Sequence, residues 1–143
     1  PQVGVSLRVI VVQMPGEEPI ALINPEIVKC AGEQEVTEGC LSVPGYYGEI
    51  KRPAEVTIKG KDRRGKAVRI KATGLMAEAI EHEIDHLNSI LFVDRAAADT
   101  LCWLIPDPEA EDGYRLEETT IEEAKRRFAR LRAKRQAKEE AQQ

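Results

Sequence analysis

Cysteines, aromatic residues and long apolar runs are all scarce in this sequence. Its three cysteines are too few and too widely spaced for a disulfide framework, so we expect a reducing compartment. Aromatic residues make up 4% of the chain, and aliphatic side chains must therefore fill the core. There is no run of about 18 apolar residues, so no segment is expected to span a membrane. No secretory signal is visible, which is weak evidence because the sequence begins with Pro1.

The net charge of −4 is unevenly distributed along the chain. The stretch 125–138 contains eight basic residues and no acidic ones: Lys125, Arg126, Arg127, Arg130, Arg132, Lys134, Arg135 and Lys138. Without these eight, 13 of the 21 basic residues remain against 25 acidic ones, a net charge of −12. An acidic body with a basic tail is typical of a protein whose tail contacts a partner.

The hydrophobic pattern changes from strand-like to helix-like near residue 74. Strands are predicted over 6–13, 20–23, 27–30, 36–43, 54–59 and 67–72. Asn24-Pro25 is expected to end the second strand, and the turn at 61–65 should join the last two in a hairpin. Apolar residues at 76, 80, 84, 87 and 91 predict a buried helix over 75–91, with Thr73 as its N-cap.

A second helix is expected to begin at the capping box of Thr120 and Glu123. Its apolar stripe is thin and consists of Ile121, Ala124, Phe128 and Leu131. The preceding segment, 96–118, is mixed in character and carries no motif. We therefore predict an α+β fold with antiparallel strands packed around one buried helix and a peripheral C-terminal helix. Residues 1–118 would form one domain, and 119–143 would form the basic helix.

The motif His-Glu-Ile-Asp-His at 82–86 contains both histidines of the chain. Residues four apart share one face of a helix, so His82 and His86 can bind a single metal ion. Glu83, beside the first histidine, can then reach a metal-bound water molecule. The alternative is two core or surface histidines that are four apart by chance. Burying two imidazoles and two carboxylates without partners is costly, which favours the metal site.

A catalytic metal normally takes three protein ligands and leaves one position for water. Residues 38–45 offer the Cys40 thiol at the end of a predicted strand, and a nearby metal would deprotonate it. From the residues alone, Cys40 and one of the many carboxylates are equally good candidates for the third ligand.

Residues 38–42 (Glu-Gly-Cys-Leu-Ser) together with 82–87 (His-Glu-Ile-Asp-His-Leu) resemble the peptide deformylase family. The two motifs are highly specific as a pair, whereas the histidine motif alone is shared with many zinc peptidases. The resemblance runs from Pro1 to about Arg95 and includes the hairpin at 54–72. The family removes the formyl group from N-terminal formyl-methionine of new polypeptides and releases formate.

The resemblance implies a role for each motif residue. The metal ligands would be Cys40, His82 and His86. Glu83 would transfer protons, while the Gln2 side-chain amide and the Leu41 backbone N–H would stabilise the oxyanion. The metal would be Fe²⁺ in the cell, and Zn²⁺, Ni²⁺ or Co²⁺ could occupy the same ligands.

Other matched positions concern substrate and support. The substrate-binding residues implied by the resemblance are Gly39, Leu75 and Ala79. Glu78 stands where an apolar side chain is expected, which affects the shape of the pocket for methionine. Glu38 and Arg52 match positions that can pair and steady the strand of Cys40. The alternatives are ordinary helix packing for the pocket residues and two solvated charges for the pair.

Both ends of the sequence carry further expectations. Pro1–Gly4 resembles the continuation of a glycine-rich family motif that ends in Ala-Ala-x-Gln, and the earlier part of that motif is not in this sequence. The sequence is therefore either a fragment or an unusual family member. The basic C-terminal helix could contact ribosomal RNA through phosphates, without sequence specificity, or remain solvated. A bacterial cytoplasm is the expected location, with an organelle as the alternative.

Two rival functions remain open. A zinc peptidase would use the same helix with a third ligand after it, for which Asp94 is the nearest carboxylate. A catalytically impaired, deformylase-like module could instead serve in ribosome or RNA binding.

Overall fold

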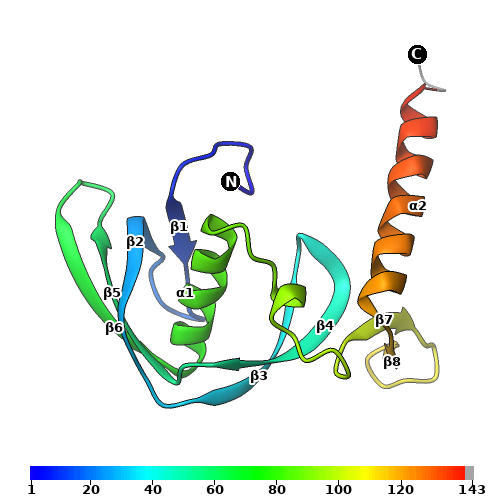
Figure 1. The fold of residues 1–143 in the computed structure, drawn as a ribbon, viewed down its shortest axis with the longest axis horizontal. Coiled ribbons are helices and arrows are strands. Elements are labelled where there is room, and N and C mark those ends of the chain that lie inside the picture. The colour runs from blue at the N-terminus through cyan, green and yellow to red at the C-terminus, as the bar shows by residue number, and fades with distance from the viewer. Residues whose placement is uncertain (141–143) are drawn as a thin grey trace. The chain divides into compact units, whose positions relative to one another are not determined.

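Residues 1–140 are described by the computed structural model of the chain (Figure 1). Its elements are β1 (Val9–Val12), β2 (Ile20–Ala31), β3 (Gln34–Cys40), β4 (Val43–Arg52), β5 (Glu55–Lys61), β6 (Ala67–Thr73), α1 (Gly74–Leu87), the 3₁₀ helix η1 (Phe92–Asp94), β7 (Cys102–Pro106), β8 (Tyr114–Glu118) and α2 (Ile121–Glu140). The α+β class is confirmed, with antiparallel strand pairs and a helix that carries the two histidines. No helix within these residues is long and apolar enough to cross a membrane.

The chain divides into two compact units. The first contains Pro1–Glu38 and Glu49–Ala96, and the second contains Gly39–Gly48 and the residues from Ala97 onward. Four strands in the order β1-β2-β5-β6 form one sheet, and the order β3-β4-β7-β8 forms the other.

The core of the first unit lies between α1 and the β1-β2-β5-β6 sheet. Helix α1 packs against β1, β5 and β6 (Figure 1). Alternation along β5 places Val56 and Ile58 inward, both 1% exposed. From α1, Ala77 and Ile80 are fully buried against them. This packing fixes the face of α1 that carries its apolar residues and so sets the direction of its remaining side chains.

The predicted hairpin is present, because β5 pairs with β6 from Glu55↔Thr73 to Lys61↔Ala67. The prediction that Asn24-Pro25 ends a strand is wrong, since β2 continues through both residues. Asn24 adopts a φ of 51°, and the register with β5 shifts between Ile23 and Glu26. An irregularity of this kind accommodates a proline that has no N–H to donate to the ladder.

Helix α1 begins where the sequence indicated but ends early. Thr73 occupies the N-cap position with extended backbone, although its side chain makes no capping hydrogen bond. The helix stops at Leu87 rather than Leu91, because Asn88 forms the C-cap and Ser89 has a φ of 62°. Leu91 matched the helical spacing by coincidence and belongs to the following segment.

The second unit contains a hairpin in the region where the sequence pattern was mixed. Strands β7 and β8 pair from Cys102↔Glu118 to Pro106↔Tyr114. The Trp103 ring lies 4.3 Å from that of Tyr46, and Phe128 of α2 lies 5.6 Å from Tyr46. These aromatic contacts hold the start of α2 within this unit.

The predicted start of α2 is confirmed. The Glu123 N–H donates to the Thr120 hydroxyl at 3.2 Å, which is half of the expected capping box. Ala124 of its thin apolar stripe is 6% exposed, whereas Leu131 is 53% exposed. Beyond its first turns the helix buries little, as expected for a peripheral element.

Candidate metal centre

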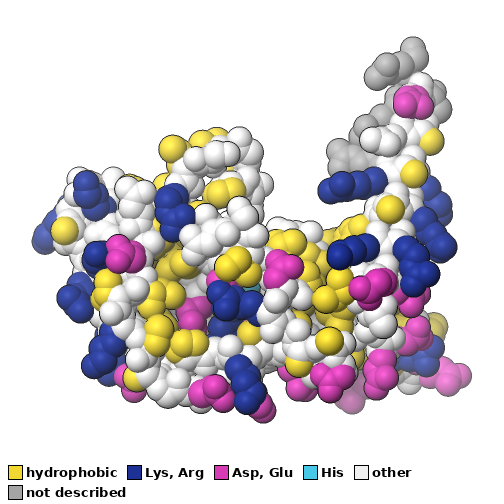
Figure 2. All heavy atoms as spheres, viewed as in Figure 1, with side chains coloured by type: hydrophobic (Ala, Val, Ile, Leu, Met, Phe, Trp, Pro, Cys, Tyr) yellow, Lys and Arg dark blue, Asp and Glu magenta, His cyan; other side chains and the backbone are white. Residues whose placement is uncertain are grey.

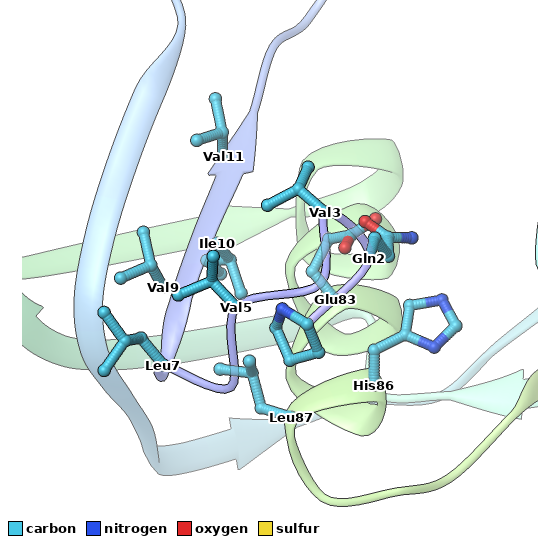
Figure 3. Close-up of a pocket in the computed structure, with 11 residues that line it drawn as sticks. Gln2, Val3, Val5, Leu7, Val9, Ile10, Val11, Glu83, His86 and Leu87 are labelled. Carbon is cyan, nitrogen blue, oxygen red and sulfur yellow. The ribbon is translucent and has the colours of Figure 1, made fainter.

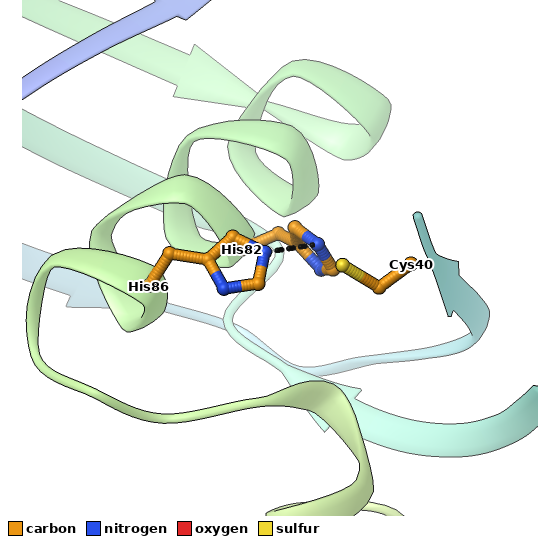
Figure 4. Close-up of side chains that lie close together, drawn as sticks. All are labelled: Cys40, His82 and His86. Atoms are coloured by element: carbon orange, nitrogen blue, oxygen red, sulfur yellow. Dashed lines mark hydrogen bonds between the residues drawn. The ribbon is translucent and has the colours of Figure 1, made fainter. Parts of the chain in front are cut away.

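His82 and His86 lie on consecutive turns of α1 and point their rings toward a common place (Figure 4). Their Nε2 atoms are 3.1 Å apart, and the rings stand at 89° to each other. Two nitrogen ligands of one tetrahedral ion would be roughly 3.3 Å apart, given metal–nitrogen bonds of about 2.05 Å. The pair therefore has the spacing of two ligands to one ion.

Cys40, the last residue of β3, completes a group of three donors with these histidines. The Cys40 sulfur and the two ring nitrogens all lie within 4.8 Å of one another (Figure 4). The Ser42 N–H donates to the sulfur at 3.4 Å. One thiolate and two imidazoles suit Fe²⁺ or Zn²⁺, so the residues present fit a divalent metal.

Glu38 fixes the proton on His82. Its Oε2 lies 2.8 Å from Nδ1 of His82, so a carboxylate that can only accept requires the proton on Nδ1. In the neutral ring, Nε2 of His82 then presents its lone pair toward His86, which is the form that binds a metal. Burial lowers the pKa of His86, so this ring also favours the neutral form that coordinates.

The predicted pairing of Glu38 with Arg52 is present, and neither side chain is solvated. Arg52 donates from Nε and Nη2 to the two oxygens of Glu38 at 2.7 and 2.9 Å, and the residues are 3% and 4% exposed. Burial raises the pKa of Glu38, but hydrogen bonds from His82 and Arg52 outweigh it and bring this pKa to about 2. The carboxylate that orients His82 is therefore ionised at any physiological pH.

Glu83 and Gln2 line one groove of about 410 Å³ that His86 also lines (Figure 3). Its other walls come from the N-terminal segment, β1, His86 and Leu87. Most of the lining side chains are apolar, including Val3, Val5, Leu7, Val9 and Val11. The groove thus combines an apolar wall with a carboxylate, an amide and one candidate ligand.

The remaining predicted site residues are placed differently. Leu41 follows β3 in a turn, and its side chain is 95% exposed. Leu75 is 59% exposed and Ala79 packs on the core of the first unit, and neither lines the groove. A Cβ on Gly39 would come within 2.7 Å of the Tyr47 ring, so any other residue at this position would have to displace that ring.

Three charged residues of the site were not predicted from the sequence. Asp85 accepts from Arg52 at 2.6 Å, and Arg95 donates to both oxygens of Asp85 at 2.6 Å each. Burial raises the pKa of Glu81 to about 7, and its Oε2 has no hydrogen-bond partner among the described residues. The signal that could have found the acids is their place on the apolar helix α1, where burial demands a partner or a proton.

Comparison with known proteins identifies the family. The model of the polypeptide deformylase family matches residues 1–100. The chain belongs to this family. A peptide deformylase of Dehalococcoides mccartyi (strain CBDB1) is 53% identical over 117 residues, which cover 80% of this chain and 70% of that protein. The resemblance stated from the two motifs is therefore confirmed.

Solved polypeptide deformylases also share the fold. One from Legionella pneumophila matches with a TM-score of 0.64 and 50% identity, covering 67% of this chain and 58% of that one. One from Synechococcus elongatus in complex with actinonin matches with a TM-score of 0.59 and 44% identity. The match covers 62% of this chain and 51% of that one. The chain thus spans little more than half the length of these structures. Polypeptide deformylases are metal-dependent hydrolases, in agreement with the group of donors found here.

Proposed function

We propose that the chain acts as a peptide deformylase, which removes the N-formyl group from formyl-methionine at the start of nascent polypeptides and releases formate. The observation that carries this proposal is the convergence of the Cys40 sulfur with the nitrogens of His82 and His86 in a chain of this family. The bacterial relatives support a bacterial cytoplasm as the location. Residues 1–118 as the deformylase domain, with 119–143 as an appended helix, remain our interpretation.

Each residue of the site has a chemical task in this proposal. Cys40, His82 and His86 would hold one divalent ion, Fe²⁺ in the cell with Zn²⁺, Ni²⁺ or Co²⁺ as substitutes. Such an ion supplies Lewis acidity to the formyl carbonyl and lowers the pKa of water. Glu83 accepts the proton of the attacking water and delivers it to the leaving amine. Its position in the groove with Gln2 supports this assignment.

The developing oxyanion requires hydrogen-bond donors that are already in place. We assign these to the Gln2 side-chain amide and the Leu41 backbone N–H, which directly follows the ligand Cys40. Gly39, Leu75 and Ala79 are retained as substrate-binding residues on the strength of the family resemblance. The exposed Leu75 side chain is available to an incoming peptide, whereas Ala79 acts through the packing of α1.

The proposal is tested by formate release from a formyl-Met peptide. Glu83→Gln should lower kcat by about 100-fold or more, because the groove loses its proton acceptor. Asp94→Asn should retain activity, since the Asp94 carboxylate accepts the Leu91 N–H and lies outside the group of donors. A metal-loaded, folded chain without formate release would contradict the proposal.

The same variants separate this function from that of a zinc peptidase. Loss of bound metal in Cys40→Ala with retention in Asp94→Asn supports the deformylase ligands. The opposite result would assign the third ligand to Asp94, as the peptidase alternative requires. The number of metal ions bound per chain is measured in Cys40→Ala and in Asp94→Asn.

We further propose that α2 contacts ribosomal RNA through its basic side chains, acting on phosphates without sequence specificity. Six of them are exposed, namely Lys125, Arg126, Arg130, Arg132, Lys134 and Lys138. Arg127 instead lies 4.8 Å from the centre of the Trp103 ring, and the side chain of Arg135 lies outside the described residues. Figure 2 shows Lys and Arg side chains along the helix.

Truncation after Thr119 should abolish pelleting with ribosomes at low salt if α2 is the contact. The β5–β6 hairpin offers a matched control, because Arg63, Arg64, Lys66 and Arg69 are also exposed. Changing these four to Gln removes comparable charge and should leave pelleting intact. Equal loss in both variants would indicate attraction by net charge, and unchanged pelleting after truncation would refute the contact.

A further inference from the structure

A chain of alternating charges runs from the metal ligand His82 to an arginine near the surface. His82 Nδ1 donates to Glu38 at 2.8 Å, and Arg52 holds the two oxygens of Glu38 at 2.7 and 2.9 Å. Arg52 Nη1 donates to Asp85 at 2.6 Å, and Arg95 donates to Asp85 through Nε and Nη2, both at 2.6 Å. All five groups belong to the first unit.

Burial makes each partner in this chain of charges necessary. The side chains of Glu38, Arg52 and Asp85 are only 3%, 3% and 8% exposed, whereas that of Arg95 is 44% exposed. Two carboxylates face two guanidinium groups, so the set is neutral. Without Arg95, Arg52 would be the single cation between two buried carboxylates, and one negative charge would be left without compensation.

The geometry also explains how a distant arginine acts on a histidine. Oδ2 of Asp85 accepts from both Arg52 and Arg95, so the bidentate contact with Arg95 fixes this carboxylate. A fixed Asp85 holds Nη1 of Arg52, while Nε and Nη2 of the same guanidinium donate to Glu38. Glu38 is then held in the orientation in which it accepts the His82 proton.

We propose that Arg95 is a positioning residue for the metal ligand His82 and acts through Asp85, Arg52 and Glu38. The inference rests on the proposed metal centre and adds a residue outside the two motifs. When Arg95 is lost, Asp85 draws Arg52 toward itself, and the hold on Glu38 weakens. His82 then samples the tautomer with its proton on Nε2, which cannot coordinate.

Metal affinity tests the proposal without any substrate. Partners that orient a ligating histidine typically contribute about 10- to 100-fold to metal affinity, so Arg95→Gln should raise the Kd for Zn²⁺ within that range. Arg95→Lys should recover part of the loss, because one ammonium supplies the charge but cannot bind both oxygens in parallel. Competition with a chelator measures the Kd for Zn²⁺ of the parent chain, Arg95→Gln and Arg95→Lys.

Arg8, which precedes β1 and contacts the C-terminal end of α1, provides a matched control. It is exposed, and its Nη1 donates to the Leu87 carbonyl and to the Asn88 side chain at 2.9 and 3.1 Å. Arg8→Gln therefore removes an arginine that is bound to the end of α1 but is not part of the charge chain. The Kd of Arg8→Gln for Zn²⁺ should equal that of the parent chain. An equal rise in Kd in Arg8→Gln and Arg95→Gln would contradict the proposal, because it would show that Arg95 only stabilises α1 in general.

The histidine tautomer gives a second readout in metal-free protein. The chain has two histidines, so ¹⁵N-histidine labelling yields two rings to assign. The His82 Nδ1–H signal should be present in the parent and Arg8→Gln proteins and should be lost or shifted toward the Nε2–H form in Arg95→Gln. If that variant does not fold, Arg95→Lys should show a partial shift.

Unchanged tautomer and unchanged Kd in a folded Arg95 variant would overturn the proposal. Formate release is measured separately, and its absence would refute the deformylase function. The positioning of His82 by Arg95 would still be decided by the Kd for Zn²⁺ and the His82 tautomer.

Discussion

Glu38 shows how a single buried carboxylate can serve two purposes. Its Oε1 accepts from Arg52, and its Oε2 is shared between Arg52 and His82. The Arg52 contact compensates its charge, and the His82 contact selects the tautomer that can bind a metal. Stability and chemistry therefore depend on the same two oxygens.

Glu38→Gln should lower the free energy of unfolding by about 3–5 kcal/mol, because it leaves the buried Arg52 with one anionic partner in place of two. Chemical denaturation of the metal-free chain measures this. Glu35→Gln on the same strand is the control, since Glu35 is exposed and its closest contact with Lys51 is 3.7 Å. Its effect should stay within about 0.5 kcal/mol. Equal effects in the two variants would contradict the role assigned to Glu38.

At the scale of elements, the β5–β6 hairpin is tied at its turn by Asp62. The Asp62 carboxylate accepts the N–H groups of Arg64 and Lys66 at 2.8 and 2.9 Å. Gly65, with a φ of 79°, completes the turn and donates to the Asp62 carbonyl. The turn sets the register that places Val56 and Ile58 against α1.

Asp62→Ala should destabilise the hairpin at pH 7 and lose that effect in acid. The Lys66 N–H, followed by the Arg64 N–H, lowers the pKa of Asp62 below 3.8 in the folded chain. A lowered pKa stabilises the fold above pH 3.8, and the contribution is lost as the pH falls through the folded-state value. Denaturation of parent and variant between pH 7 and pH 2 should show curves that converge. A constant difference would rule out the charge as the cause.

The elements differ in how far the sequence predicts them. The hairpin and the start of α1 were predictable, because alternation and helical spacing act among near neighbours. The continuity of β2 through Asn24-Pro25 was not, since pairing with β5 overrides a local breaker. Strands β7 and β8 were missed because β8 is exposed throughout and shows no hydrophobic alternation.

At the scale of the whole molecule, the metal ligands come from positions far apart in the sequence. Cys40 lies on β3, while His82 and His86 lie on α1. Any ion that binds all three ligands is bound by the folded chain and not by the unfolded one. Metal binding should therefore be linked to stability.

Removal of the metal with a chelator should lower Tm. Zn²⁺ at roughly a thousand times its Kd would stabilise the fold by about 4 kcal/mol. Cys40→Ala should abolish this response, because the third ligand is lost. Cys30→Ala is the control, since Cys30 is exposed and lies outside the group of donors. A metal-dependent Tm that survives in Cys40→Ala would exclude Cys40 as a ligand.

The sequence by itself determined the pair of histidines and the carboxylate between them, because four-residue spacing on one helix fixes their common face. From the residues alone, Cys40 and one of the many carboxylates were equally good candidates for the third ligand, and only the motif resemblance favoured the thiol. The convergence of Cys40 with the histidines, and the links from Glu38 through Arg52 and Asp85 to Arg95, were decided by tertiary structure. These contacts join residues distant in sequence, and their strength comes from burial, which no local pattern encodes.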